Sequence, residues 1–216
     1  MMKTKIILAA TFALFVSTPT FAQESAPACV KGTLASYIAL GAGGCMFDSA
    51  LYRDFTYSAP VSNTITPAEI IVTPAVLPIA TAPFQGLNFS APWSAAAGKS
   101  EVSIIGYNVV PFPPQAEPAP LSADLTLDLG TAKVLGIIGS VSVTQVSTSN
   151  GLPAETVTLK VYDTCNDVCS LKQTDSVTVT PLATIQTTLT VTLTGGNDGV
   201  SLNNFATNES FGVQPE

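Results

Sequence analysis

The sequence contains no histidine. This removes the commonest general base, the commonest zinc ligand and the usual third member of a nucleophilic triad. The motifs G-x-S-x-G and S-x-x-K are missing as well. A pair of carboxylates can hydrolyse glycosides without histidine, but Asp124 and Asp128 alternate with leucines, a pattern typical of solvated carboxylates on a strand. We therefore predict no catalytic residue, no resident metal and no cofactor.

Charge is also scarce, and positive charge especially so. Charged residues make up 11% of the chain, with 8 Lys and Arg against 15 Asp and Glu, which leaves a net charge of −7. So few cations cannot neutralise a run of phosphates, so we expect no binding to nucleic acid or to anionic lipid. Beyond residue 22 no run of about eighteen apolar residues occurs. The sequence therefore predicts no membrane span.

The first 22 residues have the layout of a secretory signal peptide. Residues 1–5 form a short basic start, and residues 6–15 are apolar. Thr20 and Ala22 then place small side chains at the −3 and −1 positions of a cleavage site. We predict a leader over 1–22 and one exported domain over 23–216. Because Lys3 and Lys5 leave with the leader, the net charge changes by two, from −7 to −9. The predicted location is the cell surface or the surrounding medium.

Four cysteines occur, all after the leader: Cys29, Cys45, Cys165 and Cys169. An even count in an exported chain predicts disulfides, and three pairings are possible. We favour Cys29–Cys45 and Cys165–Cys169 because each pair is local, the second clamping a turn between two strands. A metal site or a redox pair is the alternative, but the spacing is C-x3-C and no histidine completes a mixed site.

Apolar and polar residues alternate with a period of two through most of the chain. The clearest segments are 121–129, 156–161 and 185–193, where leucine, isoleucine and valine alternate with threonine, serine and aspartate. This pattern is typical of half-buried antiparallel strands. Weaker strands are expected over 47–57, 68–72, 84–89, 101–110, 135–146, 177–179 and 200–205. The sequence thus predicts an all-β antiparallel sandwich of about nine or ten strands.

Four local features interrupt the strand pattern. Residues 33–41 are the one good helix candidate, with Thr33 as the N-cap and Gly41 after the C-terminus. A change of phase at residues 104–105 predicts a β-bulge. Five prolines in 111–120 predict an extended loop, within one sandwich or between two small domains. The glycine-rich segment 195–199 predicts a hairpin turn.

Calcium is the alternative for two acidic segments. Residues 195–199 resemble a glycine- and aspartate-rich calcium turn, but only one copy occurs and its order does not match the known repeat. Asp163, Asp167 and Asp175 surround the second cysteine pair and offer carboxylate ligands. A turn and a solvated loop are the simpler interpretations of these segments.

Aromatic residues are few, at 7% of the chain, with Trp93 the only tryptophan. Carbohydrate recognition uses exposed aromatic rings beside polar groups. If this chain binds carbohydrate in that way, the candidate contacts are Trp93 in a small-residue segment and Tyr52, Tyr57 and Tyr107 on predicted strands. The competing interpretation is that Trp93 closes one end of the core.

Residues 32–41 (GTLASYIALG), followed by Gly44-Cys45 and by residues 55–58 (FTYS), resemble a group of exported bacterial proteins. The segments around Trp93 and at 105–109 are also similar. Members of this group often carry a Pro-Glu-Pro sorting signal with a membrane helix and a basic cluster, the PEP-CTERM type. The resemblance implies processing at the surface of bacteria that make exopolysaccharide. Here Pro215-Glu216 stands where such a signal would begin, without the helix and the basic cluster, so release and a longer natural chain both fit.

Three functions compete at this point. The first is a non-enzymatic surface or extracellular-matrix protein, associated with exopolysaccharide or with surface proteins. The second is a carbohydrate-binding module that uses Trp93 and the nearby tyrosines. The third is a glycosidase that uses two carboxylates. The missing catalytic groups and the hydroxyl-rich strands favour the first.

Overall fold

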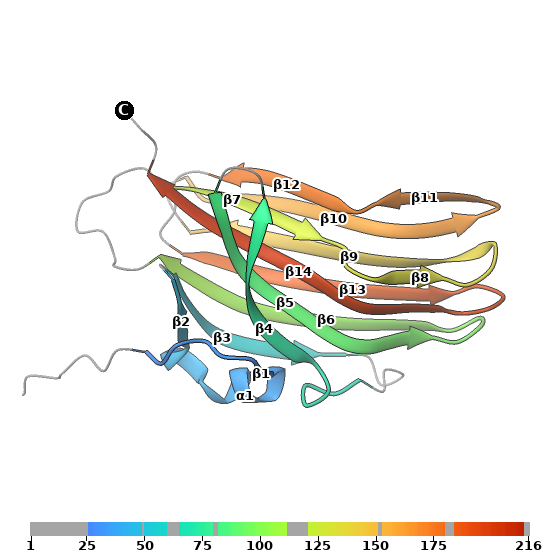
Figure 1. Cartoon of the computed structure of the whole chain (residues 1–216), viewed down its shortest axis with the longest axis horizontal. Coiled ribbons are helices and arrows are strands. Elements are labelled where there is room, and N and C mark those ends of the chain that lie inside the picture. The colour runs from blue at the N-terminus through green and yellow to red at the C-terminus, as the bar shows by residue number, and fades with distance from the viewer. Residues whose placement is uncertain are drawn as a thin grey trace, which may run out of the picture.

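The fold is an all-β sandwich of two antiparallel sheets with one short helix (Figure 1). The computed structural model describes residues 26–48, 50–59, 65–79, 82–111, 121–150, 153–179 and 184–213. The predicted leader, the carboxyl-terminal Pro-Glu pair and segment 112–120 of the proline-rich loop lie outside these residues. No helix in the described part of the chain is both long and apolar enough to span a membrane.

The first sheet, sheet 1, has the order β11-β10-β9-β13-β6-β3-β2. Its strands in chain order are β2 (Cys45–Phe47), β3 (Ala50–Ser58), β6 (Ser100–Pro111), β9 (Ile138–Ser149), β10 (Glu155–Asn166), β11 (Val168–Lys172) and β13 (Ile185–Gly195).

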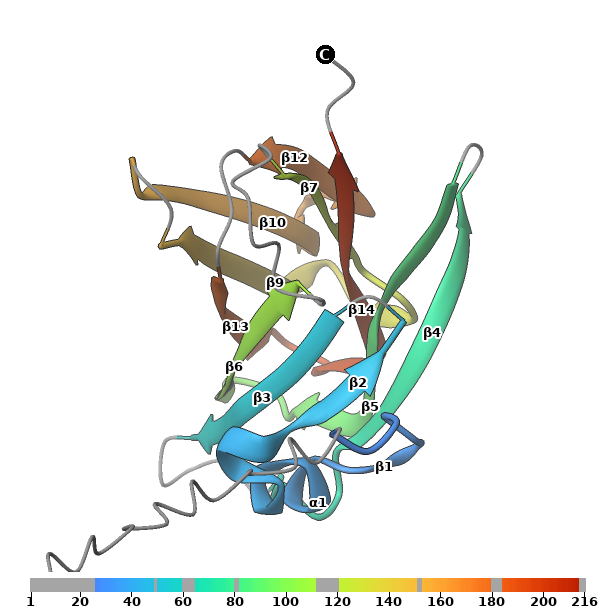
Figure 2. The same ribbon diagram turned by 90° about the vertical axis from the view of Figure 1, so that its left-hand side faces the viewer.

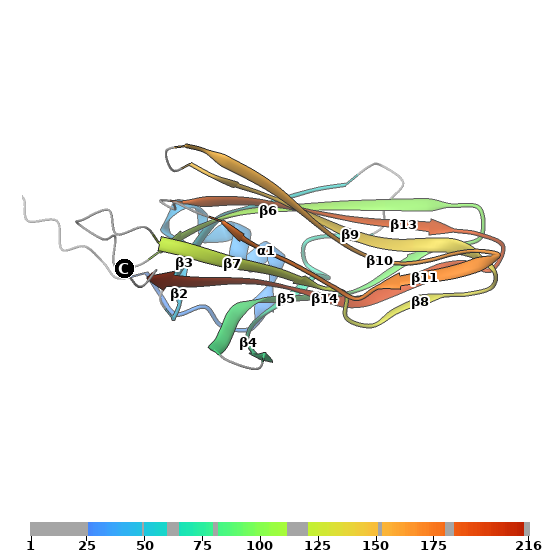
Figure 3. The same ribbon diagram turned by 90° about the horizontal axis from the view of Figure 1, so that it is seen from above.

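The second sheet, sheet 2, has the order β1-β4-β5-β14-β7-β12, with β8 also paired to β14. Its strands are β1 (Gly32–Thr33), β4 (Ile71–Ile79), β5 (Ala82–Ala95), β7 (Leu121–Asp128), β8 (Ala132–Val134), β12 (Thr174–Val179) and β14 (Val200–Val213). Viewed from above, β6 and β13 lie in one layer and β5 and β14 in the other (Figure 3).

The described residues contain fourteen strands, more than the nine or ten expected. The difference comes mainly from β1, β2, β8 and β11, which have two to five residues each. Strands this short carry too few residues for a period of two to stand out. The long alternating segments were placed correctly, because half-burial dictates their pattern.

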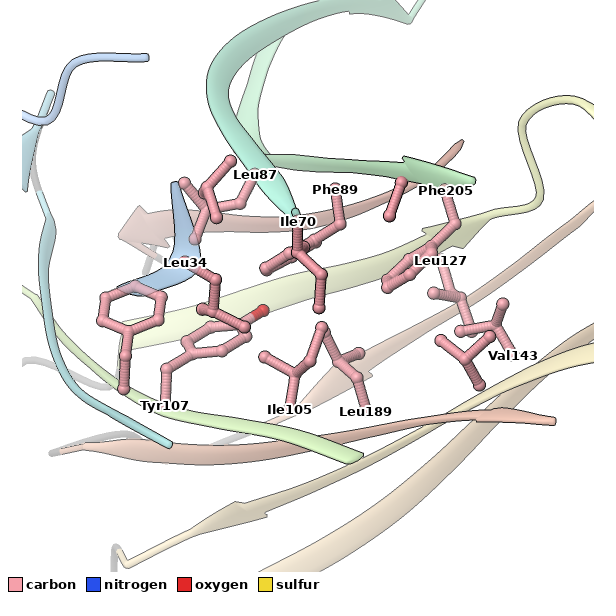
Figure 4. Packing of buried hydrophobic residues seen from close by; sticks show 14 of the residues in the cluster. Leu34, Ile70, Leu87, Phe89, Ile105, Tyr107, Leu127, Val143, Leu189 and Phe205 are labelled. Carbon is pink, nitrogen blue, oxygen red and sulfur yellow. The ribbon is translucent and has the colours of Figure 1, made fainter. Parts of the chain in front are cut away.

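The core lies between the two sheets, where the apolar members of each alternating strand meet (Figure 4). Leu125 and Leu127 of β7 are fully buried, as are Leu189 and Val191 of β13. Phe89 of β5 stacks on Phe205 of β14 with ring centroids 5.2 Å apart. These buried side chains form one continuous cluster across both sheets.

The helix prediction is confirmed. Helix α1 covers Leu34–Ala39, and the side chain of Thr33 caps it by accepting a hydrogen bond from the Ser36 backbone N–H at 3.2 Å. Gly41 follows the C-terminus with a φ of +54°, a backbone conformation that favours glycine. Leu34 and Tyr37 are buried, so the helix packs one face on the sandwich, at the end of β3 (Figure 2).

Both favoured disulfides are present. Cys29 and Cys45 join the segment before α1 to β2, with Cα atoms 4.9 Å apart. Cys165 of β10 lies directly opposite Cys169 of β11, and their Cα atoms are 4.0 Å apart. The second bond closes the tight β10–β11 turn, as the spacing predicted. No free cysteine occurs in the described part of the chain.

The β-bulge expected at residues 104–105 is wrong. Strand β6 alternates without interruption, burying Ser103, Ile105, Tyr107 and Val109. Buried Ser103 produced the apparent phase change: a serine stands where the pattern calls for an apolar residue. The irregularity lies instead in the neighbouring strand β3, whose register with β6 shifts between Arg53 and Thr56.

The hairpin expected at residues 195–199 is also wrong. This segment joins β13 of sheet 1 to β14 of sheet 2, so it is an arch between layers rather than a turn between paired strands. Arches also join β5 to β6 and β8 to β9 at the same end of the molecule (Figure 1). The Gly98 N–H donates to the Gly195 carbonyl at 3.0 Å, and the Leu135 N–H donates to the Gly199 carbonyl at 3.1 Å.

Candidate functional site

The aromatic residues proposed as ligand contacts do not form an exposed platform. Trp93 is 1% exposed, Tyr52 and Tyr107 are equally buried, and Tyr57 is half-buried. The expectation that Trp93, Tyr52 and Tyr107 contact a carbohydrate from the surface is therefore corrected. They are core residues because strand alternation directs all three toward the opposite sheet.

Trp93 belongs to the core, in agreement with the alternative that it packs in the interior rather than on the surface. Its ring lies 5.5 Å from that of Phe205, measured between centroids. Its indole N–H donates to the Ser103 hydroxyl at 3.3 Å. The Tyr57 hydroxyl lies 3.2 Å from the same serine oxygen and donates to the Ile65 carbonyl at 2.7 Å. Buried Ser103 is thus a polar anchor for two aromatic rings.

A buried carboxylate bridges the two sheets. Glu209 of β14 is 2% exposed and accepts hydrogen bonds from Tyr107 of β6 at 2.7 Å and from Tyr52 of β3 at 3.4 Å. Thr207 of β14 lies 2.9 Å from the Tyr107 hydroxyl. Among the described residues, no cation forms an ion pair with Glu209. A buried carboxylate without a cation favours its neutral form.

The pKa values of this cluster follow from burial. Burial raises the pKa of Glu209 to about 7, although the hydrogen bonds from Tyr107 and Tyr52 act in the opposite direction. Burial, together with the nearby Glu209 charge, also raises the pKa of Tyr52 and of Tyr107 well above their usual value. The cluster is enclosed between the sheets, and its hydrogen bonds link them.

An open depression lies on the face of sheet 2 that points away from the core. We call this depression the β7–β12 trough. Its volume is about 560 Å³. Asp124 and Thr126 of β7 and residues 174–178 of β12 line it. Since Leu125 and Leu127 point into the core, Asp124 and Thr126 point away from it. The trough therefore lies on the polar face that the sequence pattern predicted.

Most of the residues that line the trough carry a hydroxyl or a carboxylate group; the exception is Val177. Thr178 donates to one Asp124 carboxylate oxygen at 2.6 Å. Thr174 and Ser176 stand on the same side of β12 as Thr178, because side chains two apart share a face. Each hydroxyl both donates and accepts, and a carboxylate accepts through two oxygens. Such a surface matches a ligand that itself carries many hydroxyl groups.

Asp175 holds β12, the strand behind the trough, against sheet 1. It lies opposite Leu127, on the side of β12 that faces the core. It forms an ion pair with Lys172 at 2.8 Å and accepts from the Lys160 backbone N–H at 2.8 Å. Burial opposes its ionisation, but the Lys172 side chain and the Lys160 and Ser176 N–H groups together lower its pKa. Asp175 is thus held ionised between β10 and β12.

No group of three or more potential metal-ligating side chains comes together in the described ranges. Asp175 is engaged with Lys172, and residues 195–199 form the arch between sheets. A second, smaller depression of about 230 Å³ lies beside the Cys29–Cys45 disulfide, lined mainly by apolar side chains. Neither of the two acidic segments considered for calcium therefore brings three such side chains together among the described residues.

No protein-family model matches this sequence, and no curated protein matches it. Several solved structures show distant similarity, and three of them are described here. A family 16 carbohydrate-binding module has 11% identity and a TM-score of 0.25, over 67% of this chain and 85% of that one. A family 11 carbohydrate-binding module from Clostridium thermocellum, solved with a β-1,3-1,4-mixed-linked tetrasaccharide, has 10% identity and a TM-score of 0.26, covering 73% and 87%.

The third structure is the enzymatically active domain of tailspike protein 4 of bacteriophage CBA120. It has 8% identity and a TM-score of 0.26, over 72% of this chain and 19% of that one. TM-scores this low carry no argument from the ligands or activities of those proteins to this chain. The case for a function therefore rests on the residues of the trough itself.

The sequence predicted the polar face on which Asp124 lies, but it did not predict the depression itself. The alternation over 121–129 put Asp124 on a polar face, where the structure has it. The pairing of β7 with β12, fifty residues apart, was not readable from a local pattern. The buried role of Glu209 was missed as well, although Asn208-Glu209-Ser210 inside a strand is a polar run that could have flagged it.

Proposed function

We propose that this chain is a non-enzymatic exported protein that binds extracellular polysaccharide through the β7–β12 trough, as a component of the cell surface or matrix. One observation carries the proposal: an open depression of about 560 Å³ is lined mainly by residues that carry hydroxyl groups, with Asp124 among them. Two disulfides agree with an extracellular setting, because such bonds persist where the environment is oxidising.

Calorimetric titration of the purified protein with the extracellular polysaccharide of the producing cell tests this proposal. Asp124→Ala combined with Ser176→Ala removes polar groups from both strands of the trough. We expect a loss of affinity of about tenfold or more, since each lost hydrogen bond contributes about 1 kcal/mol. The matched control is Thr190→Ala with Thr192→Ala, which removes hydroxyls from the solvent face of β13.

Retained binding by the control and weakened binding by the trough variant would support the proposal. Absence of saturable binding by the native protein would contradict it. Equal losses in both variants would show that the sheet faces bind without a defined site.

The carboxylate-pair glycosidase remains a weaker alternative. Burial raises the pKa of Asp128, which would suit a general acid beside Asp124. However, the two residues are four apart on one strand, about 13 Å along its axis, beyond the 5–9.5 Å that glycosidase pairs use. We expect no release of reducing ends from the bound polysaccharide. Release that Asp124→Asn abolishes would overturn the non-enzymatic assignment.

A further inference from the structure

Strand β11 is the terminal strand of sheet 1 and pairs only with β10 in the described part of the chain (Figure 1). A terminal strand presents a row of backbone N–H and C=O groups that can pair with another strand. Proteins usually protect such edges with proline, charged side chains, a bulge, a very short strand or a covering segment. Strand β11 has no proline and no bulge, and its five residues pair with β10 in continuous register. Its one charged residue, Lys172, is the last of the strand and forms an ion pair with Asp175.

The opposite edge of sheet 1 is protected. Strand β2 has three residues, and Ala28 forms a bridge with Met46 on that strand. In sheet 2, β1 has two residues. Strand β12 presents the hydroxyls of the β7–β12 trough rather than apolar side chains. Beyond β1, the open edge of β4 carries Pro74 and Pro78. Among the edge strands in the described part of the chain, β11 is the one on which large apolar side chains are recorded as exposed.

Exposed apolar side chains gather around β11. Val168 is 81% exposed and Leu171 is 62% exposed. Ile137 of the neighbouring β8–β9 arch and Ile138, the first residue of β9, are exposed as well. The Asp167 N–H donates to the Ile137 carbonyl at 3.0 Å. Apolar side chains grouped in this way on a soluble protein mark an interaction surface.

The chemistry of this edge fits a second copy of the chain. We propose that two copies pair antiparallel through β11 about a two-fold axis at Ser170, which joins their first sheets into one. This register pairs all five residues of β11, so it forms the longest ladder that the strand allows. It is also isologous and closed, so it yields a dimer rather than a fibre.

The two-fold register makes the side chains complementary. Val168 and Lys172 share one face of β11, while Cys169 and Leu171 share the other, because strand faces alternate. In the dimer, Val168 lies opposite Lys172 of the second copy and covers the aliphatic part of that side chain. Leu171 lies opposite Cys169 of the second copy, beside its disulfide to Cys165. Each exposed apolar side chain thus gains a partner.

Sedimentation velocity of the purified protein tests the pairing by mass, and two substitutions of Val168 test the register. Val168→Lys places a lysine opposite Lys172 of the second copy, twice in each dimer, and like charges in opposed positions destabilise a strand pair. Val168→Glu places a carboxylate opposite the same lysine. We expect a native dimer, a monomeric Val168→Lys variant and a dimeric Val168→Glu variant.

Val146→Lys is the matched control. Val146 is 37% exposed on the solvent face of β9, away from the edge, so this variant should remain dimeric. A monomeric native protein would overturn the proposal, and so would a dimer that survives Val168→Lys. Monomers from both Val168 variants would overturn the register.

Hydrogen exchange above and below the dimer midpoint locates the interface independently. Association should slow exchange of amides within residues 168–172 and leave β2 and β12 unchanged. Slower exchange at β12 or β2 instead would assign the dimer to another edge and overturn the proposal. This inference does not depend on polysaccharide binding, because β11 does not line the trough.

Discussion

Glu209 is the residue whose chemistry differs most from its ordinary behaviour. It is buried between the sheets, held by two tyrosine hydroxyls, and has its pKa raised to about 7 from an ordinary value of 4.5. A carboxyl group whose pKa is raised on folding stabilises the folded state in its neutral form. That contribution is fully present below about pH 4.5 and is lost as the pH rises through about 7.

We therefore expect Glu209→Gln to flatten the dependence of stability on pH. The native protein should lose up to about 3 kcal/mol of unfolding free energy between pH 4.5 and pH 8 through this group, at 1.36 kcal/mol for each pKa unit. The amide of glutamine keeps a hydrogen-bond acceptor for Tyr107 but does not titrate. Urea unfolding at pH 4.5, 6 and 8 measures the effect.

The matched control for this experiment is Glu69→Gln. Glu69 is an exposed carboxylate whose pKa is lowered by hydrogen bonds from the Thr66 backbone and side chain. Because its shift has the opposite sign, its removal should leave the loss of stability above pH 4.5 in place. A native protein equally stable at pH 4.5 and 8 would refute the role of Glu209.

At the scale of elements, the two disulfides constrain loops of different length. Cys29–Cys45 spans 16 positions and Cys165–Cys169 spans 4. Chain entropy predicts a loss of about 3 kcal/mol for Cys29→Ser with Cys45→Ser, against about 2 kcal/mol for Cys165→Ser with Cys169→Ser. Chemical denaturation of each double variant measures these losses. A larger loss from the second pair would show that β10–β11 rigidity, not loop closure, dominates.

The arch between β13 and β14 depends on a close backbone approach at Gly196. A Cβ atom there would overlap the carbonyl oxygen of Ile138, which belongs to the backbone and cannot move aside. Gly196→Ala should therefore lower the unfolding free energy by more than about 1 kcal/mol. Gly43→Ala is the control, since a Cβ atom at Gly43 meets no atom within 4 Å. Equal thermal stability of the two variants would contradict the packing argument.

For the whole molecule, the buried side chains of both sheets form one cluster. Trp93 lies within that cluster and reports on sheet packing, whereas far-ultraviolet circular dichroism reports on the strands. We expect the two signals to change together in urea, as they do when a single domain unfolds in one step. Two separated transitions would favour the alternative of two small domains divided near segment 111–120.

Local patterns determined much of this structure. The alternation over 121–129 and 185–193 depends only on which face of a strand meets the core, so it predicted both strands. The helix that follows Thr33 was readable because a capping side chain and a terminal glycine lie within nine residues. Both disulfides were readable for the same reason, since each closes a local loop.

Long-range pairing decided the rest. Whether residues 195–199 make a hairpin or an arch depends on which strands flank β13 and β14, and those strands are distant in the sequence. From the sequence alone, Trp93 and Tyr107 could be surface or core residues. The structure shows that they are core residues, because the opposite sheet covers them. The trough needs β7 beside β12, and the Glu209 cluster needs β14 facing β3 and β6. By itself the sequence determined the long alternating strands, the helix and the cysteine pairs, because a periodic local environment imposes a local pattern. Only the tertiary structure decided the site, the arches and the exposed edge, because these arise where segments far apart in the chain meet.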